Sequence, residues 1–162
     1  MGGGLGILPG IDALLRALQK SPKFNVTVIT GHNRELFNHL KQTYPEIEVV
    51  GFTDQVPRFM KKADVILSKA GGLTLSEAIH SETPIYVLDP FLRHERENAA
   101  YICREMIGGI IESSSEEGMQ EFICSISSTP MIRCAGENMR RIRESYRGHE
   151  LPVIMDDLKR EA

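Results

Sequence analysis

The chain has 162 residues, of which 41% are hydrophobic and 25% charged, and its net charge at pH 7 is −3. This length predicts a single domain that buries about two thirds of the surface of the unfolded chain. The weak negative charge excludes the strongly basic class of nucleic-acid-binding proteins, and no apolar run reaches the about 18 residues that a membrane span needs. The amino end also lacks the basic-then-apolar order of a secretory signal, so we expect a domain that is cytoplasmic or faces the cytoplasm.

Short apolar runs alternate with helical patterns along most of the chain. Helices are expected between these runs because apolar residues recur there at helical spacing. Strands that alternate with helices of this length predict βαβ units, and therefore an α/β fold in which helices cover both faces of a parallel sheet. The predicted strands read FNVTVIT (24–30), IEVVGF (47–52), DVILS (64–68), PIYVLD (84–89) and GGIIE (108–112), and the predicted helices between them cover 11–20, 33–44, 56–63, 73–81 and 95–106.

The last third of the chain predicts two more helices. Ser113 and Ser114 stand at capping-box spacing before two glutamates, which predicts a helix over 116–127. Pro130 then opens a C-terminal helix and tail over 130–162. The arginines of this last helix predict a solvated face, with contact to an anionic lipid or a partner as the alternative: Arg133, Arg140, Arg141, Arg143 and Arg147.

The three cysteines, Cys103, Cys124 and Cys134, form no CxxC pair and no cluster with histidine. This spacing does not fit a metal site, so we expect free, buried thiols in a reducing compartment.

The chain opens with MGGGLG, a glycine-rich turn with no strand in front of it. In α/β folds such a turn normally follows a strand, which directs the turn toward a ligand beyond the sheet. We therefore expect residues 1–162 to be a fragment of a longer protein, or to receive their first strand from another segment.

Gly71 and Gly72 lie between the strand DVILS and a helical pattern, where two glycines cost conformational entropy on folding. Bare main-chain amides at the start of a helix form an anion site. Gly3 and Gly4 in the opening turn offer a second set of amides at the same sheet edge, so the pair of turns predicts a diphosphate ligand. Neither turn has the GxGxxG spacing or the P-loop lysine, which disfavours a nicotinamide cofactor.

Glu77 has two interpretations. The order Thr74-Leu75-Ser76-Glu77 fits a capping box, in which the glutamate accepts a bond from the amide of Thr74. Alternatively, Glu77 lies one turn inside the helix and accepts bonds from the two hydroxyl groups of a ribose. Spacing alone leaves both roles open.

A charged segment, 91–98, follows the strand PIYVLD. It is either a solvated loop or a site at which His94 and Glu95 bind the hydroxyl groups of a sugar, with Asn98 supporting the loop. His32 stands at another strand end and is either a surface residue or a donor to a phosphate. The sequence contains no Ser/His/Asp order, no cysteine nucleophile context and no acidic metal pair, so we expect no complete catalytic machinery in this chain.

The order of these motifs resembles the C-terminal half of the glycosyltransferases that make monogalactosyl or glucosyl diacylglycerol. It is similar, more distantly, to the peptidoglycan N-acetylglucosamine transferase. The resemblance covers residues 1–112 and is carried by GGGLG, TGHN, GFTDQVPRFMKKADVILSKAGGLTLSEAIHSETPIYVLDP and HERENAAYI. It implies a GT-B enzyme, with two Rossmann-like domains across a cleft, of which this chain is the half that binds the nucleotide-sugar donor.

The resemblance also implies roles for individual residues. The reaction would be inverting, without metal or cofactor, and would transfer a hexose from a UDP-sugar to a membrane lipid such as diacylglycerol. The catalytic base and the acceptor groove would belong to an N-terminal domain that is absent here, so the isolated chain would bind donor without turnover, in the cytoplasm or at the inner face of the membrane. The implied contacts are Gly3, Gly4, His32, Gly71, Gly72, Leu73 and Thr74 for the diphosphate, Phe52, Val56 and Glu77 for uracil and ribose, and His94, Glu95 and Asn98 for the sugar.

Two positions depart from the family pattern. His32 stands where the lipid-glycosylating members carry arginine, and His94 stands where they usually have glutamine. The first change makes one phosphate contact weaker or pH-dependent, and the second leaves the sugar open. The alternatives are a free-standing donor subunit of a two-chain N-acetylglucosamine transferase and a nucleotide-binding module without activity.

Overall fold

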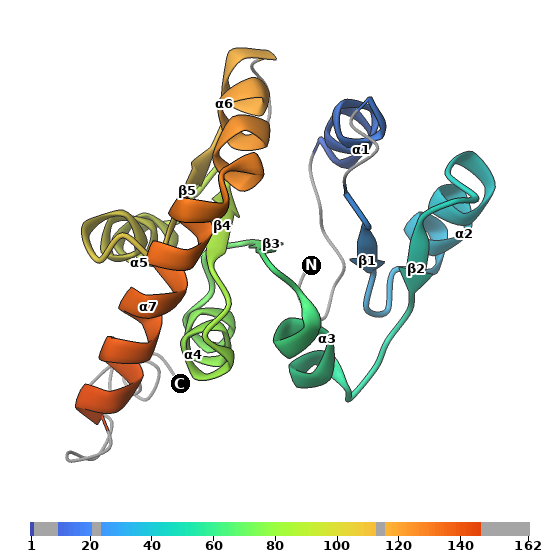
Figure 1. Ribbon diagram of the computed structural model, residues 1–162. Helices are drawn as coiled ribbons and strands as arrows, with labels where there is room; N and C mark the ends of the chain where they lie inside the picture. Colours follow the sequence, from blue (N-terminus) through green and yellow to red (C-terminus); the bar gives the residue numbers. More distant parts are fainter. Residues whose placement is uncertain (2–9, 21–23, 113–115, 147–162) are drawn as a thin grey trace.

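The computed structural model describes residues 1, 10–20, 24–112 and 116–146 (Figure 1). Helices and short strands alternate along the described chain, as predicted, and each strand lies within its predicted run. The strands are β1 (Thr27–Ile29), β2 (Glu48–Val50), β3 (Ile66–Ser68), β4 (Ile85–Leu88) and β5 (Gly108–Ile111). The helices are α1 (Ile11–Gln19), α2 (Arg34–Thr43), α3 (Val56–Lys62), α4 (Gly72–Ser81), α5 (Arg93–Arg104), α6 (Glu116–Ser127) and α7 (Thr129–Tyr146).

All the described strand pairs are parallel, but they form two sheets instead of the one that was predicted. β1 pairs with β2, with Val28 opposite Val49, and β3, β4 and β5 pair in that order, with Leu67 opposite Tyr86. The sheet divides because, within the described residues, no strand lies between β1 and β3. Figure 1 shows the amino terminus in the region between these two strands.

The central strand of the larger sheet, β4, is buried on both faces. Ile85 and Val87 lie in one apolar cluster with side chains of α3, α4, α5 and α7. Tyr86 and Leu88, which alternate with them, lie in a second cluster with side chains of α1, α2 and α6. A strand buried on both sides is typical of a parallel sheet between two helical layers, so the predicted α/β architecture is confirmed.

The second cluster also joins the two sheets. It contains Val28 and Val49 from the smaller sheet together with Leu88 and Ile111 from the larger sheet, and Leu67 of β3 packs against it. The two sheets therefore share one hydrophobic core although their strands do not pair.

The arginines of α7 are only partly a solvated face. Arg143 Nη2 lies 2.6 Å from Glu82 Oε1, and Arg140 Nε lies 3.0 Å from Glu82 Oε2. These two ion pairs fix α7 to the end of α4, whereas Arg133 and Arg141 are exposed. Arg147 and the predicted cap at Ser113 and Ser114 lie outside the described residues.

The prediction of buried cysteines is wrong. Cys103, Cys124 and Cys134 are free, and all three are exposed, because each lies on the outward side of an amphipathic helix. No described helix is long and apolar enough to cross a membrane.

Candidate functional site

The residues predicted to contact a ligand follow the carboxyl ends of four strands. His32 follows β1, Phe52 follows β2, Gly71 follows β3, and the segment before α5 follows β4. Because the strands are parallel, these positions lie along one edge of the sheets. This is the edge at which α/β folds bind ligands.

The glycine turn after β3 leads directly into α4. Gly71 is the N-cap of this helix, with φ −75° and ψ 140°, and its carbonyl accepts the first helical bond, from the amide of Leu75 at 3.0 Å. The amides of Gly72, Leu73 and Thr74 precede that bond and have no carbonyl within the helix to pair with. Three donors and the positive end of the helix dipole therefore coincide at this turn.

Neither the backbone conformation nor the packing of the protein requires a glycine at position 71. Its φ is negative, and a Cβ added there would meet only Thr74 Oγ1, at an ordinary contact distance of 3.8 Å. Gly108 on β5 differs, because a Cβ there would lie 1.7 Å from the carbonyl oxygen of Ile85. The glycine at 108 serves the fold, whereas the glycine at 71 keeps the outer side of the turn open.

The capping-box interpretation of Glu77 is wrong. Helix α4 begins at Gly72, so Thr74 occupies the third helical position and is not the N-cap, and no side chain caps the helix. Glu77 lies on the second turn and is half-buried. Among the described residues, no hydrogen bond to its carboxylate is seen.

Glu95 has a structural role that the sequence analysis missed. Its Oε2 accepts hydrogen bonds from the amides of Phe91, at 3.0 Å, and Leu92, at 3.1 Å, and so caps the start of α5. Burial favours a higher pKa for this carboxyl group, but the amide bonds and the positive charge of Lys69 together hold its pKa below the ordinary value. Glu95 is therefore an ionised group whose Oε2 is already committed to the backbone.

Asn98 connects α5 to the glycine turn. Its Nδ2 donates a hydrogen bond of 2.7 Å to the carbonyl oxygen of Ala70, the residue before Gly71. The predicted diphosphate turn and the predicted sugar segment are thus held together by a direct bond between residues 28 positions apart.

His32 and Phe52 form an aromatic pair at the ends of β1 and β2. Their ring centroids lie 4.2 Å apart with an interplanar angle of 18°, and the Phe52 side chain is 66% exposed. Gly31 has a φ of 57°, which allows the tight turn after β1, and Asn33 caps α2 by accepting a 2.9 Å bond from the amide of Leu36. The turn thus places an exposed ring platform at the sheet edge.

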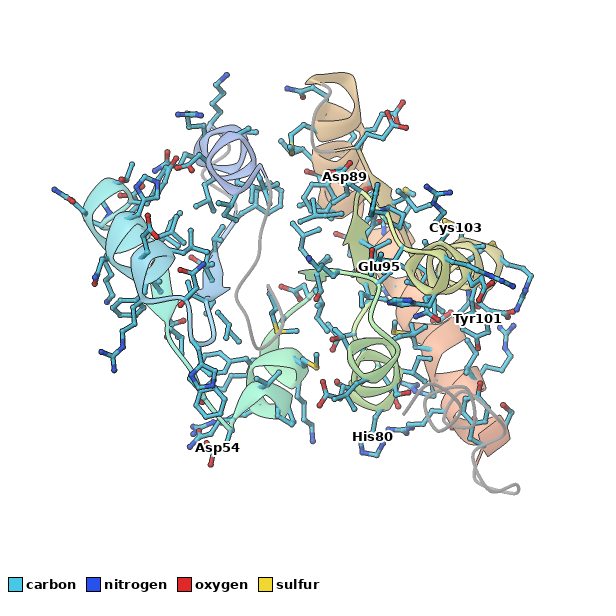
Figure 2. All side chains as sticks on the ribbon, turned by 180° about the vertical axis from the view of Figure 1, so that it is seen from behind. Asp54, His80, Asp89, Glu95, Tyr101 and Cys103 are labelled. Atoms are coloured by element: carbon cyan, nitrogen blue, oxygen red, sulfur yellow. The ribbon has the colours of Figure 1, made fainter. Side chains whose placement is uncertain are left out.

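The remaining predicted residues have less defined surroundings. Leu73 and His94 are exposed, while Val56 is half-buried and packs against the cluster that contains Met60. Gly3 and Gly4 lie outside the described residues. Figure 2 shows Glu95 near the start of α5 and far from His80, which lies near the C-terminal end of α4.

Two features of the site had no signal in the sequence. Lys69 lies close enough to Glu95 to lower the pKa of its carboxyl group. Asp89, which follows β4, has a φ of 33°, a strained conformation for a residue other than glycine. In the part of the chain that the structure describes, no three His, Cys, Asp or Glu side chains gather as they would around a metal ion.

Residues 10–135 match the model of the family described as glycosyltransferase family 28 C-terminal domain. The chain belongs to this family. The match covers the glycine turn, Glu77, the aromatic pair and the start of α5, so the predicted resemblance is confirmed.

Several curated relatives of this chain are named as glycosyltransferases that act on diacylglycerol. The processive diacylglycerol beta-glucosyltransferase of Staphylococcus carnosus is 28% identical over 153 residues, which cover 92% of this chain and 39% of that protein. The enzyme of the same name from Bacillus pumilus is 25% identical over 163 residues, covering 98% of this chain and 41% of that protein. The chain thus spans about two fifths of the length of these relatives.

A solved structure confirms the fold. The glycotransferase of kitacinnamycin superposes with a TM-score of 0.73 at 19% identity, over 96% of this chain and 39% of that one. The fold is therefore the Rossmann-like, C-terminal half of a GT-B glycosyltransferase.

Proposed function

We propose that this chain is the donor-binding domain of an inverting glycosyltransferase that transfers a hexose from a UDP-sugar to a membrane lipid such as diacylglycerol. The observation that carries the proposal is the start of α4. There, three amides without a carbonyl partner in the helix adjoin a glycine that the described fold does not need. Glu77 lies one turn further along, with its carboxylate unpaired among the described residues.

The diphosphate of the donor binds at the glycine turn. The amides of Gly72, Leu73 and Thr74 donate to phosphate oxygens, and the helix dipole adds a favourable field. Because position 71 carries no Cβ, the phosphate can approach the main chain closely. When the bond to the sugar breaks, negative charge grows on the departing diphosphate, and the same amides stabilise that charge without rearrangement. His32, which follows β1 at the same edge of the sheets, contributes a further contact to the diphosphate.

The nucleoside binds between the aromatic pair and α4. Glu77 accepts hydrogen bonds from both ribose hydroxyl groups, which an ionised carboxylate does well because it is purely an acceptor. Phe52, with its exposed ring, borders the uracil, and Val56 on α3 adds apolar contact.

The sugar binds at the start of α5, through the atoms of Glu95 and Asn98 that are not bonded to the main chain. Because Oε2 of Glu95 is committed to two amides, its Oε1 is left for a sugar hydroxyl group. Because the amide nitrogen of Asn98 binds Ala70, its amide oxygen is left for the sugar. His94 is exposed beside them and supplies the third contact.

The acceptor and the catalytic base belong to another domain in this proposal. The names of the relatives indicate diacylglycerol as the acceptor, and the chain corresponds to about two fifths of their length. We place the reaction at the cytoplasmic face of the membrane, and we propose that it needs no bound metal because the helix amides balance the charge of the diphosphate.

Titration calorimetry on the purified chain tests the proposal. UDP should bind with measurable heat, whereas GDP and NAD, at the same concentrations, should bind at least tenfold more weakly. Equal affinities for UDP and GDP would remove the case for a uridine site, and binding of NAD alone would indicate a dinucleotide-binding protein.

A further inference from the structure

The two most exposed large apolar side chains in the described part of the chain belong to neighbouring turns of the fold. Phe91 is 77% exposed and Leu73 is 76% exposed, and Leu92, which follows Phe91, is 48% exposed. Leu73 lies in the first turn of α4 and the other two precede α5, so all three follow the carboxyl ends of the paired strands β3 and β4. We call these three side chains the apolar edge.

Main-chain bonds hold the apolar edge in a defined position. The carboxylate of Glu95 accepts bonds from the amides of Phe91, at 3.0 Å, and Leu92, at 3.1 Å. The 2.7 Å bond from Asn98 Nδ2 to the carbonyl of Ala70 ties this segment to the turn before α4. None of the three apolar side chains belongs to either core cluster. Their exposure is therefore a property of a bonded segment, and the core does not need them.

The proposed donor leaves these side chains without a contact. The diphosphate uses the main-chain amide of Leu73, and the sugar uses polar atoms of Glu95 and Asn98. A nucleotide sugar presents only charged groups and hydroxyl groups at this place. Since apolar side chains gathered at one exposed site indicate an interaction surface, the apolar edge calls for a partner that is itself apolar.

Two arginines follow the apolar edge in the first turn of α5. Arg93 and Arg96 are both exposed, and Arg93 Nε lies 2.9 Å from Glu97 Oε1. An exposed ion pair of this kind contributes little to stability, so Arg93 can exchange the carboxylate for another anion. Exposed aromatic and aliphatic side chains next to arginine are typical of segments that lie in a membrane interface. There the apolar groups enter the acyl boundary and the guanidinium groups meet anionic headgroups.

We infer that the apolar edge, together with Arg93 and Arg96, docks onto the surface of a lipid layer that contains anionic lipids. The choice of this partner rests on the proposed function, because a diacylglycerol acceptor resides in such a layer and must reach the sugar held by Glu95 and Asn98. Docking at these residues brings the donor site to the acceptor. It also assigns the membrane contact to the starts of α4 and α5, and not to the arginines of α7.

A single tryptophan reports on this contact, because the chain contains none. Phe91→Trp exchanges one aromatic ring for another and keeps the main-chain bond to Glu95, while Met131→Trp, at a position on α7 that is 55% exposed, is the matched control. Vesicles are made from equal parts of phosphatidylglycerol and of phosphatidylcholine with brominated acyl chains, and bromine quenches only a tryptophan that enters the acyl region. The fluorescence of the Phe91→Trp chain should fall at least twofold, and that of the control should not change. No quenching in the first chain, or equal quenching in both, would overturn the inference.

Removal of the apolar side chains gives a second measurement. Phe91→Ser combined with Leu92→Ser should require at least fivefold more lipid for half of the chain to sediment with the same vesicles. Met106→Ser combined with Met131→Ser removes two other exposed apolar side chains and should leave sedimentation unchanged. Vesicles of phosphatidylcholine alone should bind the wild-type chain at least fivefold more weakly, because they lack the negative surface potential that attracts arginine. Equal sedimentation of the wild-type chain and the Phe91→Ser, Leu92→Ser chain would contradict the inference.

Vesicles with and without diacylglycerol separate a lipid surface from a single acceptor molecule. Quenching and sedimentation should already occur without diacylglycerol. If both require it, the apolar edge binds the acceptor itself and the inference is wrong. Calorimetry with UDP separates the inference from the proposed function. A wild-type chain that binds UDP but no vesicles overturns only the docking surface, whereas one that binds vesicles but not UDP overturns only the donor site.

Discussion

Asn98 donates a hydrogen bond of 2.7 Å to the carbonyl oxygen of Ala70, and this bond ties the start of α5 to the glycine turn before α4. The two segments belong to successive βα units and are predicted to hold different parts of one donor. A displacement of one therefore moves the other, so contacts to the sugar and to the diphosphate are mechanically linked.

Replacing Asn98 should weaken UDP binding although, in our account, its side chain does not touch UDP. Asn98→Ala leaves the carbonyl of Ala70 without its partner, which costs about 1 kcal/mol of stability and loosens the turn that presents the amides. We expect an affinity for UDP about five- to tenfold lower by calorimetry. Asn98→Asp should behave in the same way, because a carboxylate cannot donate the bond.

Asn138 offers a matched control for this substitution. Its Nδ2 also donates to a main-chain carbonyl, that of Met106, at 3.2 Å, but it lies on α7. Asn138→Ala should lower stability by a similar amount in urea denaturation without changing UDP affinity. An equal loss of UDP affinity in both variants would show that the effect is one of general stability.

Alanine at position 71 should separate binding from folding. The added Cβ of Gly71→Ala meets only Thr74 Oγ1 at 3.8 Å, so stability should fall by no more than about 1 kcal/mol, the cost of alanine at an N-cap. The same methyl group projects from the turn that binds the diphosphate, so UDP affinity should fall by at least tenfold in calorimetry.

Gly108→Ala should instead disrupt folding. Its Cβ would lie 1.7 Å from the carbonyl oxygen of Ile85, so β4 and β5 must separate, and we expect a loss of several kcal/mol or a failure to fold. A Gly71→Ala chain that folds normally and binds UDP with unchanged affinity would show that the diphosphate does not bind at this turn.

The exposed ring of Phe52 should contribute to binding of the base and not of the phosphates. Stacking of a base on an aromatic ring contributes about 1–3 kcal/mol, and the side chain is 66% exposed, so its removal costs little stability. Phe52→Ala should weaken UDP by about tenfold and leave the affinity for inorganic pyrophosphate unchanged. Phe91→Ala, which removes another exposed ring, should leave both affinities unchanged.

Stability should depend on pH through Asp12, which joins α1 to α2. Its carboxylate lies 2.9 Å from His39 Nε2 and accepts a 2.9 Å bond from the hydroxyl group of Tyr44. The bond to His39 lowers the pKa of Asp12 below its ordinary value; burial opposes this, and the bond to Tyr44 adds to it. A lowered pKa in the folded state means that the group stabilises the fold above the ordinary pKa of about 3.9 and loses this effect as the pH falls through the lower, folded value.

Urea denaturation of the wild-type chain and Asp12→Asn from pH 3 to pH 7 measures this contribution. The wild-type chain should be more stable at pH 6 by less than about 1 kcal/mol, since the pair is partly exposed. The difference should shrink toward pH 3. A difference that stays constant over this range would mean that the carboxylate charge has no role.

The sequence predicts the elements well and their long-range contacts poorly. Val- and Ile-rich runs identify all the described strands. The signal is clearest for β4, which is buried at every position and therefore apolar throughout. The bond between Asn98 and Ala70 has no local signal, since it joins residues 28 positions apart. The cap formed by Glu95 was missed although it lies three residues after Leu92, the spacing of a capping box, because Leu92 cannot supply the other half.

At Glu77 the sequence pattern suggests a cap that the structure does not contain. Thr74 and Glu77 have capping-box spacing, but the helix already begins at Gly72, where the main chain turns immediately after β3. A short pattern cannot reveal at which residue the chain becomes helical when glycine offers an equally good start. The prediction that the three cysteines are buried is wrong for a related reason, because composition does not show which side of a helix faces outward.

The most direct measurement is the dissociation constant of UDP for the wild-type chain, Glu77→Ala and the control Glu137→Ala, whose side chain is exposed on α7. Loss of hydrogen bonds to an ionised carboxylate costs about 1.5–3 kcal/mol. We therefore expect Glu77→Ala to bind UDP at least tenfold more weakly, with unchanged stability, and Glu137→Ala to bind like the wild type. Equal affinities for UDP in all three chains would contradict the assignment of the ribose to Glu77 and with it the proposed donor site.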